Sequence, residues 1–137
     1  MAASRKIFVN LPIENLKRSV DFFTKLGFMF NAQFTSEDTT CMNISDDAFV
    51  MLLEKPRFAS FTKKQIVDTS THVECLVALS CNSREEVEQM VKTALDNGGS
   101  AAMPSQDHGF MFAWSFYCPD GHTWEVMWMN PEHVMPT

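Results

Sequence analysis

The stretch Ile7-Phe8-Val9-Asn10-Leu11-Pro12-Ile13 decides how the rest of the sequence is interpreted. Isoleucine, valine or leucine occupies every second position, which predicts a β-strand with one strongly apolar face. Asn15 then suits a helix N-cap, and the apolar residues from Leu16 to Leu26 have helical spacing. Gly27 stands where a helix is expected to end. Three more strands are expected after it, at residues 28–34, 39–44 and 48–53.

The second half of the sequence repeats this order. Residues 73–79 alternate as a strand, and Ser83 and Glu86 form a capping box at the start of a helix. Gly98 and Gly99 end that helix, and Cys118-Pro119-Asp120-Gly121 is typical of a type I turn. Strands are expected at residues 100–106, 110–117 and 122–129.

The repeat can be followed residue by residue. Leu16, Val20, Gly27 and Glu54 recur 71 positions later as Val87, Val91, Gly98 and Glu125. The first strands align with a shift of 66 instead, so the second half carries about five extra residues before its helix. We therefore expect an α+β fold of two βαβββ modules in one domain. The modules should span about 5–54 and 72–129, joined by a loop or lid at 55–71 and followed by a tail at 130–137.

Composition and charge exclude several classes of protein. The 137 residues are 45% hydrophobic and 20% charged, with a net charge of −6, which is typical of a globular domain. Scattered lysine and arginine residues argue against nucleic-acid binding, because that needs clustered positive charge. No apolar run is long enough to span a membrane, and no apolar block follows the N-terminus, so we expect a cytoplasmic protein. The four cysteines lack metal-binding spacing and are interpreted as reduced, mostly buried thiols.

Three carboxylates stand within or beside apolar strands. Glu54 ends one strand, Glu74 lies near the start of another, and Glu125 lies deep in the last strand between Trp124 and Val126. Acidic side chains in such positions are costly unless they are paired or bind a metal. We therefore expect the three to converge on one space, where Glu125 is also the catalytic candidate. The pocket around it is predicted to include Phe8, Asn10, Met127, His108, Phe58 and Phe61.

Two segments carry a resemblance to a known family. These are the opening from Val9 to Leu16, with Leu26-Gly27-Phe28 after it, and the late Pro119-Asp120-Gly121-His122-Thr123-Trp124-Glu125. Together with the repeat, they resemble the vicinal oxygen chelate superfamily, which includes glyoxalase I, extradiol dioxygenases and bleomycin-binding proteins. The resemblance covers nearly the whole chain and is nearest to an uncharacterised glyoxalase-like subgroup. It implies two curved mixed sheets around a cavity and a homodimer.

The resemblance also implies four metal ligands, taken from the first and last strands of both modules. Glu125, Glu54 and Glu74 match three of these positions, but Phe8 replaces the fourth and cannot bind a metal. A divalent nickel, zinc, manganese or iron ion would act there as a Lewis acid. Three hypotheses follow: a small-molecule binder with an apolar cavity and no ordinary metal site, a metal-dependent lyase, isomerase or dioxygenase, and a non-catalytic dimeric interaction protein. The small-molecule binder without an ordinary metal site is favoured, because Phe8 occupies a ligand position and cannot bind a metal.

Overall fold

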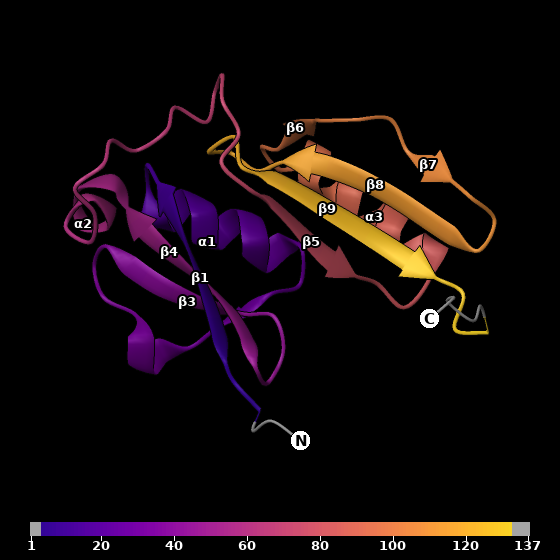
Figure 1. The fold of residues 1–137 in the computed structure, drawn as a ribbon, viewed down its shortest axis with the longest axis horizontal. Coiled ribbons are helices and arrows are strands. Elements are labelled where there is room, and N and C mark those ends of the chain that lie inside the picture. The colour runs from indigo at the N-terminus through magenta and orange to yellow at the C-terminus, as the bar shows by residue number, and fades with distance from the viewer. Residues whose placement is uncertain (1–3, 133–137) are drawn as a thin grey trace. The chain divides into compact units, whose positions relative to one another are not determined.

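The computed structural model describes residues 4–132, which fold into two compact α+β units. The first unit ends at Val67 and the second begins at Asp68, so their boundary falls inside the stretch expected to connect the modules. Each unit has a mixed sheet with a helix on one face (Figure 1). Within the described residues, no helix combines the length and apolar character needed to cross a membrane.

The first unit follows the predicted order of elements. Its strands lie in the order β1-β4-β3-β2, with β1 parallel to β4 and the other neighbours antiparallel. A long helix follows β1, and a short one follows β4. The elements are β1 (Ile7–Ile13), α1 (Leu16–Lys25), β2 (Met29–Phe30), the 3-10 turn η1 (Ala32–Phe34), β3 (Thr39–Asn43), β4 (Ala48–Glu54) and α2 (Lys55–Ala59).

The second unit repeats this topology with one interruption. Its strands lie in the order β5-β9-β8-β6, β5 is parallel to β9, and β7 also pairs with β8. The strand predicted over residues 100–106 is therefore split into two short strands, β6 and β7. The elements are β5 (Leu76–Ser80), α3 (Arg84–Asp96), β6 (Ser100–Ala101), β7 (Gln106–Asp107), β8 (Met111–Tyr117) and β9 (Thr123–Met129).

Capping explains where both long helices begin and end. The Asn15 side chain accepts a hydrogen bond from the Arg18 amide, and the Ser83 hydroxyl accepts one from the Glu86 amide. The Glu86 carboxylate accepts from the Asn82 amide at 3.2 Å, one residue before its partner in an ordinary capping box. Gly27 and Gly98 end the helices with φ of 98° and 109°. The helix ends therefore keep the predicted repeat.

Four sequence predictions need correction. Residues 28–34 are not one strand, because Asn31 caps a 3-10 turn by accepting from the Gln33 amide. Residues 55–71 are not all loop, because Pro56 suits the first turn of α2. The strand predicted at 73–79 begins only at Leu76. The strand predicted at 100–106 is interrupted around Pro104, which has no amide hydrogen to donate to a sheet.

Each core lies between a sheet and its helix. In the first unit, Leu11 of β1, Leu52 of β4 and Phe23 of α1 are all buried. In the second, Trp124 and Val126 are buried against the helix that carries Val87, Val91 and Ala94. The opposite face of each sheet, here called the open face, is less buried. This burial pattern agrees with the apolar alternation of the sequence.

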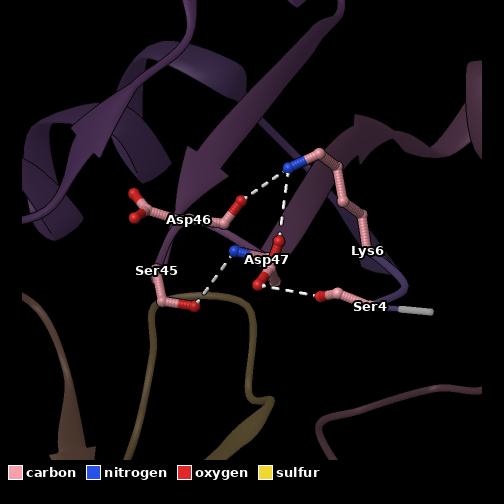
Figure 2. A network of polar contacts seen from close by, with 5 residues as sticks. All are labelled: Ser4, Lys6, Ser45, Asp46 and Asp47. Atoms are coloured by element: carbon pink, nitrogen blue, oxygen red, sulfur yellow. Dashed lines mark hydrogen bonds and ion pairs between the residues drawn. The ribbon is translucent and has the colours of Figure 1, made fainter. Parts of the chain in front are cut away.

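A network of polar contacts fixes where β1 begins on its neighbour β4 (Figure 2). The Lys6 ammonium donates to the Asp46 carbonyl at 2.8 Å and lies 3.4 Å from the Asp47 carboxylate. Ser4 donates to the same carboxylate, and the Ile7 amide donates to the Asp47 carbonyl at 2.8 Å. A slip of one residue would move every β1 side chain to the other face. The network therefore helps to decide that Phe8 and Asn10 lie on the open face.

Candidate functional site

The open face of the first unit is apolar and aromatic. Phe8 and Asn10 pair with Phe49 and Met51 of β4, and Leu53 lies further along the same face. The Phe8 and Phe49 rings stack, with centroids 4.9 Å apart and planes 14° from parallel. Phe8 is 45% exposed. A stacked pair of this kind offers a flat apolar surface with no group that can hold a metal.

A cavity of about 300 Å³ lies over this face. Helix α2 and the turn after it supply Phe58, Phe61 and Thr62, while the sheet supplies Asn10 and Leu53. The Arg57 guanidinium lies 5.1 Å from the centre of the Phe61 ring, an arrangement that supports the outer aromatic wall. The structure therefore brings together Asn10, Phe58 and Phe61 of the predicted pocket. Phe8 shares their face but does not line the cavity.

Two polar groups belong to this cavity. The Asn10 side chain donates to the Phe8 carbonyl at 3.2 Å, which holds the amide along its own strand. The Thr62 hydroxyl accepts from the Lys64 amide at 3.1 Å and keeps its proton to donate. An apolar lining with a few fixed polar groups is the usual composition of a small-molecule pocket.

Glu54 does not reach the open face, which corrects the prediction that it converges with the other carboxylates. It pairs with Ile13 and shares the helix-covered face with Val50 and Leu52. Its carboxylate accepts a hydrogen bond from the Leu16 amide at 2.9 Å. That amide belongs to the first turn of α1, where amides lack partners within the helix and negative charge is favoured. Glu54 therefore caps α1.

The open face of the second unit is more polar. Glu125 lies there between Ala78 on one side and Ser115 on the other, because Trp124 and Val126 face the helix. A cavity of about 200 Å³ includes Glu125 in its wall. Ser115 accepts a hydrogen bond from the Met103 amide at 3.1 Å, which closes one side. The other lining residues are Pro104, Gln106, Ala113 and Trp114.

Gln106 and Ser115 line this cavity but were not among the site residues predicted from the sequence. Ser115 carried a signal, because it is a polar residue inside the apolar run Met111–Tyr117. Gln106 carried none, because the sequence predicted one continuous strand over residues 100–106 and not the separate strand β7 that holds Gln106 at the cavity wall.

The remaining predicted site residues lie apart from these cavities. Glu74 precedes β5 and is exposed, so the prediction that it points from a strand into a shared site is wrong. His108 is exposed in the β7–β8 hairpin, where its ring lies 6.4 Å from that of Phe110. Met127 lies on the open face opposite Ala113. Neither His108 nor Met127 lines either cavity.

The residues present do not fit the four-ligand metal site that the resemblance implies. Glu54 is bound to a helix amide, and Phe8 occupies another ligand position. Glu74 lies outside the sheet. Over residues 4–132, no three histidine, cysteine, aspartate or glutamate side chains are grouped as a metal ion would need.

The repeat itself explains why the carboxylates were expected to converge. A shift of 71 residues carries Glu54 to Glu125, but side chains alternate with a period of two along a strand. The helix-covered positions are even-numbered in both last strands, Val50 and Leu52 in β4 and Trp124 and Val126 in β9, so an odd shift joins positions on opposite faces. Glu54 lies on the helix-covered face and Glu125 on the open face. The shift of 71 therefore relates equivalent positions at the helix ends but not in the last strands.

The cysteines do not supply a reactive thiol to either cavity. All four are free; Cys41, Cys81 and Cys118 are buried, and Cys75 is exposed because it precedes β5. Burial raises the pKa of Cys41 and Cys118, and burial together with Glu86 raises the pKa of Cys81 to about 11. These three thiols are therefore protonated near neutral pH and are weak nucleophiles.

Comparison with known proteins supports the same fold. A glyoxalase-related enzyme from Fulvimarina pelagi has a similar structure, with a TM-score of 0.79 at 16% identity over 98% of this chain and 94% of its own. A hypothetical protein, SA1046, from S. aureus has a TM-score of 0.78 at 21% identity over 92% and 95% of the two chains. No curated protein matches the chain. The model of the Glyoxalase/Bleomycin resistance protein/Dioxygenase superfamily matches residues 7–126, so the chain belongs to that superfamily.

Proposed function

We propose that this protein binds a small organic molecule with a flat apolar part, in the cavity over the open face of the first unit. The observation that carries the proposal is the cavity of about 300 Å³ bounded by Leu53, Phe58 and Phe61, with Asn10 and Thr62 as its polar groups. Cavities of this size and composition hold small ligands through apolar contact and use a few hydrogen bonds for orientation.

Binding in this cavity is proposed to need no metal ion. Phe8, stacked on Phe49, stands where the resemblance implies a metal ligand, and Glu54 is held by the Leu16 amide on the other face. Both features favour apolar recognition, because neither an aromatic ring nor a helix-bound carboxylate is available to an ion on this face.

Phe61 offers the most direct test. Its side chain is 67% exposed, so Phe61→Ala should leave the fold intact while removing one wall of the cavity. The fluorescence of N-phenyl-1-naphthylamine, a neutral probe that brightens in apolar surroundings, measures the affinity. We expect the variant to bind the probe about 5- to 30-fold more weakly, which corresponds to losing much of one aromatic contact.

Phe34→Ala is the matched control. Phe34 is also an exposed phenylalanine of the first unit, at 51%, but it lies in η1 and lines no part of the cavity. We expect its affinity for the probe to equal that of the parent protein. Equal weakening by both substitutions, or no binding by the parent protein, would refute the proposal.

A catalytic role for Glu125 is the second candidate. Its carboxylate borders the 200 Å³ cavity together with the polar side chains of Gln106 and Ser115. A carboxylate held beside a bound substrate can accept or return a proton, a contribution typically worth about 10²- to 10⁴-fold in rate. Any turnover found for this protein should then fall by that factor in Glu125→Gln.

A homodimer is proposed as the assembly. Strands β1 and β5 lie at the ends of their sheets and carry exposed apolar side chains, Ile7 at 59% and Leu76 at 57%. Exposed strand edges of this kind favour pairing with another chain. Sedimentation equilibrium should give twice the mass of 15.6 kDa.

A further inference from the structure

The second unit has another cavity, of about 420 Å³, at the end of its sheet where β9 begins and β8 ends. It is larger than the two cavities described above and shares no lining residue with either. Two sheet residues in its wall, Tyr117 and Thr123, are paired with each other across β8 and β9. Its lining is rich in hydroxyl groups, from Thr69, Ser70, Thr71, Ser100, Tyr117 and Thr123.

One wall of this cavity is a turn held in shape by its own hydrogen bonds. The Asp68 carboxylate accepts from the Ser70 amide at 3.0 Å and from the Ser70 hydroxyl at 2.6 Å. The Asp68 carbonyl accepts from the His72 amide at 2.8 Å. Three consecutive hydroxyl-bearing residues are thereby presented on an ordered backbone, so little freedom remains to be lost when a ligand binds.

The turn is pressed against the β8–β9 hairpin. The Thr69 hydroxyl donates to the Asp120 carbonyl. Gly121 has a φ of +84°, and a Cβ atom there would lie only 2.5 Å from the Thr69 carbonyl oxygen. Glycine is thus required both by the backbone angle and by the close approach. The wall of the cavity is built by close packing between two segments.

The chemistry of the lining is neutral. Among the described residues that form it, none is lysine, arginine, aspartate or glutamate. The His72 ring is oriented by a 2.7 Å hydrogen bond between its Nδ1 and the Thr71 hydroxyl, which leaves Nε2 to meet a ligand. An anion would need cationic partners and a cation would need carboxylates. The Thr69 and Ser70 hydroxyl groups already donate their protons within the protein and are left to accept, while a hydroxyl group such as that of Thr123 can both donate and accept, which suits partners of the same kind.

We propose that this cavity binds a neutral polyhydroxylated small molecule, of the class of monosaccharides and polyols. Its volume lies within the range of small-molecule sites. The lining also includes the apolar side chains of Val73 and Pro119, beside the hydroxyl groups and His72. The proposal rests on the second unit alone and does not depend on the apolar cavity of the first.

Calorimetry and saturation-transfer NMR with D-glucose, D-ribose and myo-inositol test the proposal, with D-gluconate and D-glucosamine as charged analogues. We expect saturable binding of at least one neutral compound in the millimolar range and weaker binding of both charged ones. Thr123→Val keeps the side-chain shape but removes the hydroxyl, so affinity should fall about five- to tenfold. His72→Ala changes an exposed residue and should weaken binding similarly.

Thr39→Val is the matched control, because Thr39 is also a half-buried strand threonine but lies in the first unit and lines none of the three cavities. Its affinity should be unchanged, and so should that of Phe61→Ala. Three results would overturn the proposal: no neutral compound binds, D-gluconate or D-glucosamine binds more tightly, or Thr123→Val and His72→Ala both bind as the parent protein does. Binding of N-phenyl-1-naphthylamine reports separately on the first unit.

Discussion

The two units share one topology but differ in what their open faces present. The first carries the stacked Phe8 and Phe49 rings and a cavity walled by phenylalanines. The second carries Glu125, Ser115 and Tyr117 on the corresponding face of its sheet. The repeat thus conserves the elements and their order, while the chemistry of each exposed face is set separately. In this chain, the apolar recognition and the acid–base chemistry that we propose belong to different copies.

We expect the largest changes in the free energy of unfolding from substitutions of glycines with positive φ. Gly27 and Gly98 occupy equivalent helix ends, and a Cβ atom at either would meet no close neighbour. Substitution by alanine at either site should cost about 1 kcal/mol, because only the left-handed backbone is penalised. Gly121→Ala should cost about 2–4 kcal/mol, because the Thr69 carbonyl also blocks the added atom.

Urea unfolding of the three variants measures these costs. Equal values for Gly27→Ala and Gly98→Ala would support the equivalence of the helix ends. A cost for Gly121→Ala as small as theirs would show that the turn at Thr69 is not pressed against the hairpin, and the hydroxyl-lined cavity would lose one of its walls.

The next prediction compares the stability changes on substituting Glu54 and Glu125, the two carboxylates that the repeat aligns. Glu54→Gln removes the negative charge that caps α1 and weakens the bond to the Leu16 amide, so unfolding should become easier by about 1–2 kcal/mol. Glu125→Gln should change the free energy of unfolding by no more than about 0.5 kcal/mol, because its carboxylate borders a cavity. Denaturant unfolding at neutral pH gives both values, and the reverse order would contradict the assigned faces.

The smallest effect depends on pH and belongs to the second unit. The Arg84 guanidinium binds both Asp107 carboxylate oxygens at 2.8 Å and, with the Gly109 amide, holds the pKa of Asp107 well below its usual range. Because the folded pKa is depressed, this stabilisation is present above about pH 4, the unfolded value, and is lost as the pH falls below it.

Asp107→Asn removes this dependence. The difference in unfolding free energy between the parent protein and the variant should be constant above about pH 5 and should shrink as the pH falls toward 3. Urea titrations at several pH values measure it. A difference that stays constant down to pH 3 would mean that the ion pair, which also places Arg84 over the Phe112 and Trp128 rings, does not stabilise the folded state.

Much of the fold could be predicted from the sequence because it is specified locally. Alternation placed Ile7–Ile13 and Thr123–Met129, and the Asn15 and Ser83 caps placed both helices. The interrupted strands escaped prediction because Asn31 and Pro104 redirect the backbone within apolar stretches. The site was harder to predict, because the position of the Glu54 side chain depends on a hydrogen bond from the Leu16 amide. Leu16 lies 38 residues earlier in the sequence. The alternation of β4 already placed Glu54 on the same face as Val50 and Leu52. The repeat instead aligned Glu54 with Glu125, which suggested that both carboxylates reach one shared space.

Calorimetric titration of the untagged protein with Ni²⁺ measures whether the carboxylates of the two units bind a metal ion together. We propose that Glu54, Glu74 and Glu125 form no common metal site and that the first unit recognises an apolar ligand instead. We expect no stoichiometric tight binding of Ni²⁺ by the parent protein, and none by Glu125→Ala or Glu54→Ala. Tight binding of one ion per chain that either substitution abolishes would contradict this proposal.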